Sequence, residues 1–178
     1  MVLRDPVARA YSDYRSLLPH YAGSGGASLS TVIRQSVEAL KKCAILEQPT
    51  PEQVAAAYYS CRSSVDRPHD IVKAGLYYPQ VIRWLGAMKG RLLIVTSEML
   101  KADPRRVLGE VERFLELCAP AGGVWRDLPR AVNVGRAGPV PAHLDWDNAT
   151  KELLRRFYQP FNAALSELSH GEVYFDWQ

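Results

Sequence analysis

A short apolar run in the middle of the chain constrains the fold more than any other feature of the sequence. Residues 91–96 read Arg-Leu-Leu-Ile-Val-Thr and follow Gly90, and we expect a strand over this range. An apolar run without polar alternation is typical of a strand buried on both faces, as in a parallel sheet covered by helices. Residues 1–3 form a second apolar stub, which leads into Arg4-Asp5-Pro6. We therefore expect an α/β protein with a parallel sheet flanked by helices.

Most of the remaining chain has helical periodicity, so we expect the protein to be mostly helical. Asp5, Thr50 and Asp103 stand where N-caps are expected, each directly before a proline. Pro79 predicts a kink or a late start in its helix, and Pro160 predicts a bend. Glu98 is expected to finish the strand. Two of the expected helices begin at Pro6 and at Pro104, and four others cover about 29–46, 52–60, 70–88 and 149–168. The helix that begins at Pro104 is expected to carry one apolar stripe of Val107, Leu108, Val111, Phe114 and Leu115.

Length, charge and hydropathy exclude several classes of protein. A chain of 178 residues that is 47% hydrophobic is expected to fold as one domain over residues 1–178. Its net charge of +3 is too small for a nucleic-acid-binding surface. No apolar run approaches the roughly 18 to 20 residues of a membrane-spanning helix, and the N-terminus does not resemble a cleavable signal. Three cysteines without metal-ligand spacing predict no metal site.

The turn between residues 1–3 and the first helix is a candidate anion site. The carboxyl end of a strand and the amino end of a helix meet there, and backbone N–H groups and the helix dipole both favour an anion. Arg4 lies at that edge and Ser12 lies about two helical turns further on, so both side chains can reach one phosphate. The alternative is a salt-bridged Arg4 and a Ser12 that faces solvent.

Several segments in order resemble those of Golgi carbohydrate sulfotransferases. Leu3-Arg4-Asp5-Pro6-Val7 followed by Ser12 resembles the segment of that family that binds the 3′-phosphate of the donor, 3′-phosphoadenosine 5′-phosphosulfate (PAPS). Four later segments match the family in register: 75–77 with Trp84-Leu85, 92–100, 103–115, and 157–165 with Phe-Tyr-Gln-Pro-Phe-Asn. The resemblance implies the C-terminal portion of a P-loop-like sulfotransferase domain.

The resemblance also implies site residues. Arg4 and Ser12 correspond to family residues that bind the 3′-phosphate. The loop from Asn133 through Gly135 to Arg136 corresponds to one that folds over the nucleotide, although solvated surface is an equally good interpretation of Arg136. The acceptor would be a sulfated or unsulfated glycan, which Arg126 and Arg130 can also meet.

Within the family, the chain looks most like N-acetylgalactosamine 4-sulfate 6-O-sulfotransferase, which acts on chondroitin sulfate. That resemblance implies a disulfide between Cys43 and Cys61, with two free thiols as the alternative in a reducing compartment. It also implies the Golgi lumen, where Asn148 in Asn-Ala-Thr would accept a glycan. Alternatively, Asp147 or Asn148 caps the last helix.

The sulfate-handling parts of the family's site have no counterpart in this sequence. Sulfuryl transfer needs a cradle for the sulfate and 5′-phosphate and a base for the acceptor hydroxyl. No Gly/Lys loop follows a strand here, and none of the four histidines has a paired carboxylate at useful spacing, so we identify no catalytic residue. We expect a truncated enzyme that is inactive alone. The alternative is a non-catalytic helical module that binds an anionic glycan or a protein partner; a nucleotide kinase is disfavoured because its defining loop is missing.

Overall fold

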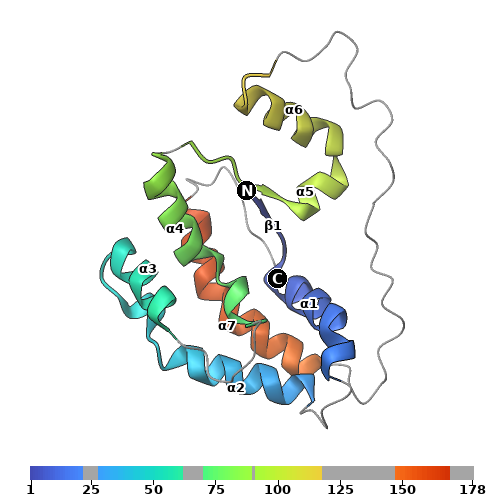
Figure 1. The fold of residues 1–178 in the computed structure, drawn as a ribbon, viewed down its shortest axis with the longest axis vertical. Coiled ribbons are helices and arrows are strands. Elements are labelled where there is room, and N and C mark those ends of the chain that lie inside the picture. The colour runs from blue at the N-terminus through green and yellow to red at the C-terminus, as the bar shows by residue number, and fades with distance from the viewer. Residues whose placement is uncertain (22–27, 62–69, 90, 118–146, 169–178) are drawn as a thin grey trace. The chain divides into compact units, whose positions relative to one another are not determined.

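The fold is described from a computed structural model, which describes residues 1–21, 28–61, 70–89, 91–117 and 147–168 (Figure 1). The chain divides into two compact units. The first unit comprises residues 1–4 and 92–136, and the second comprises residues 5–91 and 137–178. The interpretation of residues 1–178 as a single partial domain therefore stays a prediction.

The first unit contains a parallel pair of strands. β1 (Val2–Leu3) pairs with β2 (Val95–Thr96), with Val2 opposite Val95 and Leu3 opposite Thr96. The Val95 N–H donates to the Met1 carbonyl at 3.0 Å. The expected parallel sheet is confirmed for these two segments, and together with the helices of the chain it makes an α/β fold.

The predicted strand over residues 91–96 is too long. Only its last two residues pair with β1, and residues 92–94 are half-buried. The reason is that β1, the strand paired with it in the described part of the chain, is itself only two residues long. Apolar residues alone do not make a strand, because each strand residue needs a partner for its backbone groups.

Two helices follow β2 in the first unit, and the first of them was not predicted. α5 (Ser97–Ala102) begins where the Thr96 hydroxyl accepts the Met99 N–H at 3.1 Å. Glu98, which was predicted to finish the strand, lies in this helix. The expectation for Glu98 was wrong because the hydroxyl of Thr96 caps a helix directly after the strand.

α6 (Pro104–Phe114) begins at its predicted cap, where the Asp103 carboxylate accepts the Arg106 N–H at 3.0 Å. Its predicted inward stripe is only partly buried. Val107 is 1% exposed, whereas Phe114 is 43% and Leu115 is 54% exposed. Helical periodicity places these residues on one side, but burial also requires an element packed against that side.

The second unit is helical. It is built around α7 (Asn148–Leu168), which packs against α1 (Pro6–Tyr21), α2 (Leu29–Lys41) and α4 (Tyr77–Met88). α3 (Pro51–Ser60) packs against α4 and the short 3₁₀ helix η1 (Ile45–Glu47). A second 3₁₀ helix, η2 (Lys73–Gly75), contacts α1. Figure 1 shows α7, in orange, running between α4 and α1.

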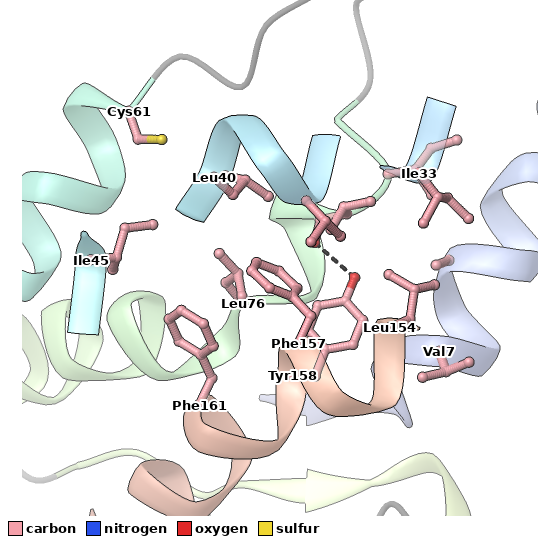
Figure 2. Packing of buried hydrophobic residues seen from close by; sticks show 14 of the residues in the cluster. Val7, Ile33, Leu40, Ile45, Cys61, Leu76, Leu154, Phe157, Tyr158 and Phe161 are labelled. Carbon is pink, nitrogen blue, oxygen red and sulfur yellow. Dashed lines mark hydrogen bonds between the residues drawn. The ribbon is translucent and has the colours of Figure 1, made fainter. Parts of the chain in front are cut away.

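The core of the second unit is a single apolar cluster, part of which Figure 2 shows. Leu154 and Tyr158, 0% and 1% exposed, come from α7, and Ile33 and Leu40 from α2. Leu76 joins them from the turn before α4 and is 0% exposed. Ile33 and Leu40 are seven residues apart and Leu154 and Tyr158 are four apart, so each pair lies on one face of its helix, which explains why both helices bury one face.

Two predicted helix boundaries in the second unit need correction. α2 ends at Lys41 and not near Leu46, because Ala44 has a left-handed backbone with φ of 46° and η1 follows it. α4 begins only at Tyr77, so Pro79 falls in its first turn, where no intrahelical N–H bond is lost. The late start that Pro79 signalled is therefore confirmed.

Candidate functional site

Helix α1 is held at its beginning by the residues that the sequence suggested. The Asp5 carboxylate accepts the Val7 N–H at 2.8 Å, and the Asp5 carbonyl accepts the Arg9 N–H at 2.8 Å. Pro6 occupies the first helical position, where its missing N–H costs nothing. This cap lies directly after Arg4.

The Asp5 cap changes the electrostatics of the proposed anion site. Its carboxylate uses one of the N–H groups that a phosphate at the helix end would otherwise receive. It also adds a negative charge at the positive end of the helix dipole. Recognition of a phosphate near this turn therefore has to come from side chains more than from the helix terminus.

Arg4 has an unused hydrogen-bond donor. Its side chain is half-buried, and its Nε is buried without a hydrogen-bond partner within the described part of the chain. Leaving a buried guanidinium nitrogen unpaired is costly, so such a group generally has a partner, whether protein, water or ligand. The Nε atoms of Arg9 and Arg15 are likewise buried without a hydrogen-bond partner in the described residues, so the role of Arg4 stays a prediction.

Ser12 lies on the exposed side of α1. Ala10 and Tyr14 are 1% and 3% exposed and bury the opposite side of the helix in the core. Because Ser12 is two residues from each of them, it lies on the other side of the helical wheel, and its side chain is exposed. A hydroxyl in this place is accessible to a ligand, and it is also compatible with simple exposure to solvent.

Arg9 of α1 contacts a distant segment of the chain, and it was not identified as a site residue from the sequence. Its guanidinium donates to the Asp13 carboxylate on the same helix and to the Ile71 carbonyl. A signal was present, because Arg9 and Asp13 stand at i, i+4 spacing. The contact with Ile71, 62 residues away, was not readable from that spacing.

Tyr158 of α7 meets the same segment as Arg9. Its hydroxyl donates to the Val72 carbonyl at 2.8 Å, the bond drawn as a dashed line in Figure 2. Burial raises the pKa of this hydroxyl, and the nearby Arg9 charge opposes the rise. Arg9 and Tyr158 thus hold the backbone of residues 71–72 from two helices.

A pocket of about 420 Å³ opens beside this segment. Two carboxylates, two tyrosines and one lysine contribute to its wall. We call it the Asp13–Asp70 pocket; it is lined by Asp13 of α1, Tyr58 and Tyr59 of α3, and Asp70, Ile71, Lys73 and Ala74. The sequence had not identified it, because its walls come from three separate parts of the chain.

Burial shifts two titratable groups of the pocket. It raises the pKa of the Asp70 carboxyl above its usual value, and the Lys73 N–H, the Lys73 charge and the Arg9 charge act against this. Burial, together with Tyr59 and Asp70, raises the pKa of the Tyr58 hydroxyl to about 12. Tyr58 is therefore a protonated hydroxyl throughout the physiological range.

Cys43 and Cys61, which the resemblance pairs, are joined by a disulfide with a Cα–Cα distance of 5.7 Å. Cys43 follows α2 and Cys61 follows α3, so the bond ties together the C-terminal ends of two helices. Cys61 also borders the pocket region, since its carbonyl accepts a hydrogen bond from the Lys73 ammonium at 2.6 Å.

At the start of α7, Asp147 is the residue that caps the helix. Its carboxylate accepts the Thr150 N–H at 2.7 Å, and its carbonyl accepts the Lys151 N–H at 3.2 Å. Asn148 is the first residue of the helix and is exposed. Glycosylation of Asn148 stays a prediction.

The Asp147 cap predicts a pH dependence. Hydrogen bonds from the Thr150 side chain and backbone lower the pKa of the Asp147 carboxyl. A lowered folded-state pKa adds stability that is present above the unfolded value of about 3.9 and is lost as the pH falls through the folded value. We expect acidification from pH 7 to pH 3 to lower the melting temperature more in the wild type than in Asp147→Asn, measured by circular dichroism. Equal losses in both proteins would contradict this role.

Several predicted site residues lie outside the described part of the chain. They are Asn133, Gly135 and Arg136 of the nucleotide loop, and Arg126 and Arg130 of the suggested glycan contact. Their roles stay predictions. None of the helices in the described ranges is both long and apolar enough to cross a membrane.

Comparisons with known proteins identify the family of this chain. A family model described as "Sulfotransferase domain" matches residues 1–127, which include Arg4, Ser12 and the strand pair. Carbohydrate sulfotransferase 15 of Homo sapiens is 28% identical over 192 residues, and the Mus musculus protein of that name is 27% identical. Both alignments cover 100% of this chain and 30% of the relative, so the chain spans about a third of the relatives' length.

Proposed function

This chain belongs to the sulfotransferase-domain family, and from that premise we propose that it forms the part of a carbohydrate sulfotransferase that binds the 3′-phosphate of PAPS. The acceptor is a hydroxyl of a glycosaminoglycan-type carbohydrate, with N-acetylgalactosamine 4-sulfate as the unit that receives the sulfuryl group. The names of both relatives support a carbohydrate acceptor. The compartment that goes with this function is the Golgi lumen.

The observation that carries the proposal is the family match across the Arg4 segment, together with the unpaired Nε of Arg4. A guanidinium with a free N–H suits a phosphate, because each N–H···O bond is strengthened by both charges. The exposed Ser12 hydroxyl is proposed to contribute a further bond to the same group. PAPS supplies the activated sulfuryl group, and these two residues hold and orient its nucleotide end.

The donor-binding role predicts a loss of affinity in Arg4→Ala. Isothermal titration calorimetry of the whole chain with adenosine 3′,5′-bisphosphate is expected to show affinity about tenfold or more lower than in the wild type. The basis is that a hydrogen bond to a charged group contributes roughly 1.5–3 kcal/mol. Ser12→Ala removes one neutral hydroxyl and is expected to weaken binding less than Arg4→Ala.

The control for Arg4→Ala is Arg113→Ala, which removes an exposed arginine at the end of α6. Both variants lose one positive charge, so an effect of net charge alone would weaken binding equally in both. Wild-type protein that binds sulfated glycan but no adenosine 3′,5′-bisphosphate would contradict the proposal and favour the non-catalytic binding module.

A further inference from the structure

The Asp13–Asp70 pocket is not accounted for by the proposed donor site. Its volume of about 420 Å³ falls within the roughly 300–1,000 Å³ of small-molecule sites. Its lining holds two aspartates, Asp13 and Asp70, and one cation, Lys73, so it lacks the excess of positive charge that favours the phosphates of a nucleotide. The pocket therefore calls for a ligand other than PAPS.

One carboxylate of the pocket has an unused acceptor. Asp70 Oδ1 accepts the Lys73 N–H at 2.9 Å. Its other oxygen, Oδ2, is buried and accepts no hydrogen bond from the described residues. A buried carboxylate oxygen without a donor is unfavourable, so a ligand or water that donates a hydrogen bond would stabilise it.

The places where a ligand cation would bind are already taken by cations of the protein. The Lys73 ammonium lies 4.8 Å from the centre of the Tyr58 ring, and the Arg83 guanidinium lies 4.5 Å from that of Tyr59. The Arg9 guanidinium pairs with the Asp13 carboxylate. A further cation would meet these charges, whereas an anion would meet two carboxylates. An uncharged ligand avoids both penalties.

We propose that the Asp13–Asp70 pocket binds an uncharged sugar ring of the acceptor glycan, one that carries hydroxyls but no sulfate or carboxylate. Pairs of sugar hydroxyls donate to the carboxylates of Asp13 and Asp70, the latter through its unused Oδ2. Tyr59 lines the same pocket and is 48% exposed, and the part of its ring that the Arg83 guanidinium does not cover offers an apolar surface to the C–H groups of the sugar. That this sugar belongs to an acceptor chain rests on the proposed function.

The pocket then sets a charge preference along the glycan. A unit bearing sulfate is disfavoured in the pocket because its negative charge faces Asp13 and Asp70. The unit that receives the sulfuryl group therefore lies elsewhere, and the pocket holds an unsulfated N-acetylhexosamine or hexose of the same chain. The pocket therefore favours acceptor glycans in which the unit at this position carries no charge.

A matched pair of sugars tests the inference. Methyl N-acetyl-β-D-galactosaminide and its 4-O-sulfate share one ring and differ by a single anionic group. Titrated into the ¹⁵N-labelled whole chain and followed by NMR, the neutral glycoside is expected to bind with millimolar affinity and to shift amide signals of residues 70–74 and of Tyr59. The 4-O-sulfate is expected to bind these residues at least tenfold more weakly.

Two variants localise the binding. Asp70→Asn keeps the shape of the side chain and an acceptor for the Lys73 N–H but removes the negative charge. It is expected to lower the affinity for the neutral glycoside about tenfold. It is also expected to reduce the difference in affinity between the neutral glycoside and the 4-O-sulfate. Tyr59→Ala alters an exposed side chain and is expected to lower the affinity for both sugars. The control, Glu38→Gln, neutralises an exposed carboxylate on α2 outside the pocket and is expected to change neither affinity.

Each result has a defined meaning. No saturable shift at millimolar glycoside, shifts confined to other residues, or tighter binding of the 4-O-sulfate would overturn the inference. Adenosine 3′,5′-bisphosphate is titrated into the same sample. If the nucleotide binds and the neutral sugar does not, the pocket assignment fails while the proposed function stands. If the sugar binds and the nucleotide does not, the donor proposal fails alone.

Discussion

Replacing Cys43 and Cys61 together by alanine is expected to lower the free energy of unfolding by about 3 kcal/mol, which is the chain-entropy value for a loop of this size. The bond joins residues 18 apart, and it holds the end of α2 to the end of α3. Without it the unfolded chain gains conformations while the folded contacts stay. Urea denaturation followed by circular dichroism measures the difference.

A matched background separates this effect from thiol chemistry. Both proteins are compared in a Cys118→Ala background, so that no third thiol can exchange with the bond. Reducing the bond with dithiothreitol is expected to reproduce the destabilisation of the double variant. If the double variant unfolds at the same urea concentration as its parent, the disulfide contributes nothing to stability in solution.

Gly75→Ala is the second substitution for which a large effect is expected. It is expected to lower the free energy of unfolding by up to about 3 kcal/mol, which is the upper end of the range typical of overpacked cores. A Cβ at this position would lie 2.7 Å from the Tyr158 hydroxyl oxygen and 2.8 Å from the ring carbon that carries it. Tyr158 is 1% exposed and its hydroxyl is bonded to Val72, so the ring has no free space to move into.

Gly86→Ala is the control for Gly75→Ala, and its expected effect has the opposite sign. A Cβ at Gly86 meets nothing within 4 Å, and Gly86 lies inside helix α4. Alanine is favoured over glycine within a helix by about 1 kcal/mol, so this variant is expected to be more stable than the wild type. Differential scanning calorimetry measures both variants under one condition.

The steric explanation of Gly75 is tested in a Tyr158→Phe background. This change removes the nearest atom, and Gly75→Ala is expected to cost less there than in the wild type. An equal cost in both backgrounds would show that the penalty does not come from the Tyr158 hydroxyl but from the ring carbons, which also lie within 2.9 Å of the Cβ, or from the backbone of residue 75.

Local rules predicted helix beginnings well. Thr50 and Asp103 were expected as caps, and their side chains accept the Gln53 and Arg106 N–H groups. A cap depends on a side chain and a backbone group only three residues away, so the sequence contains all the information that forms it. Strand length was not predictable in the same way, because the number of paired residues in β2 depends on β1, which is more than 90 residues away.

The two candidate sites also differ in whether their residues are close together in the sequence. The Arg4 and Ser12 segment was visible as a contiguous motif, and the described structure adds only which of its groups are buried or unpaired. The Asp13–Asp70 pocket was not visible, because α1, α3 and residues 70–74 supply its walls. Nothing in the neighbourhood of Asp13 within the sequence indicates that it lines a pocket together with Asp70.

The sequence by itself determined most of the helical segments, several of their caps, the two apolar runs that contain the strands, and the sulfotransferase-like motif order. These depend on contacts within a few residues or on hydrophobic periodicity. The tertiary structure alone decided that Arg9 bonds to the Ile71 carbonyl, that Tyr158 closes over Gly75, and that two aspartates share a pocket. Those contacts join residues far apart in the chain, and their existence depends on how whole helices pack and not on any local preference.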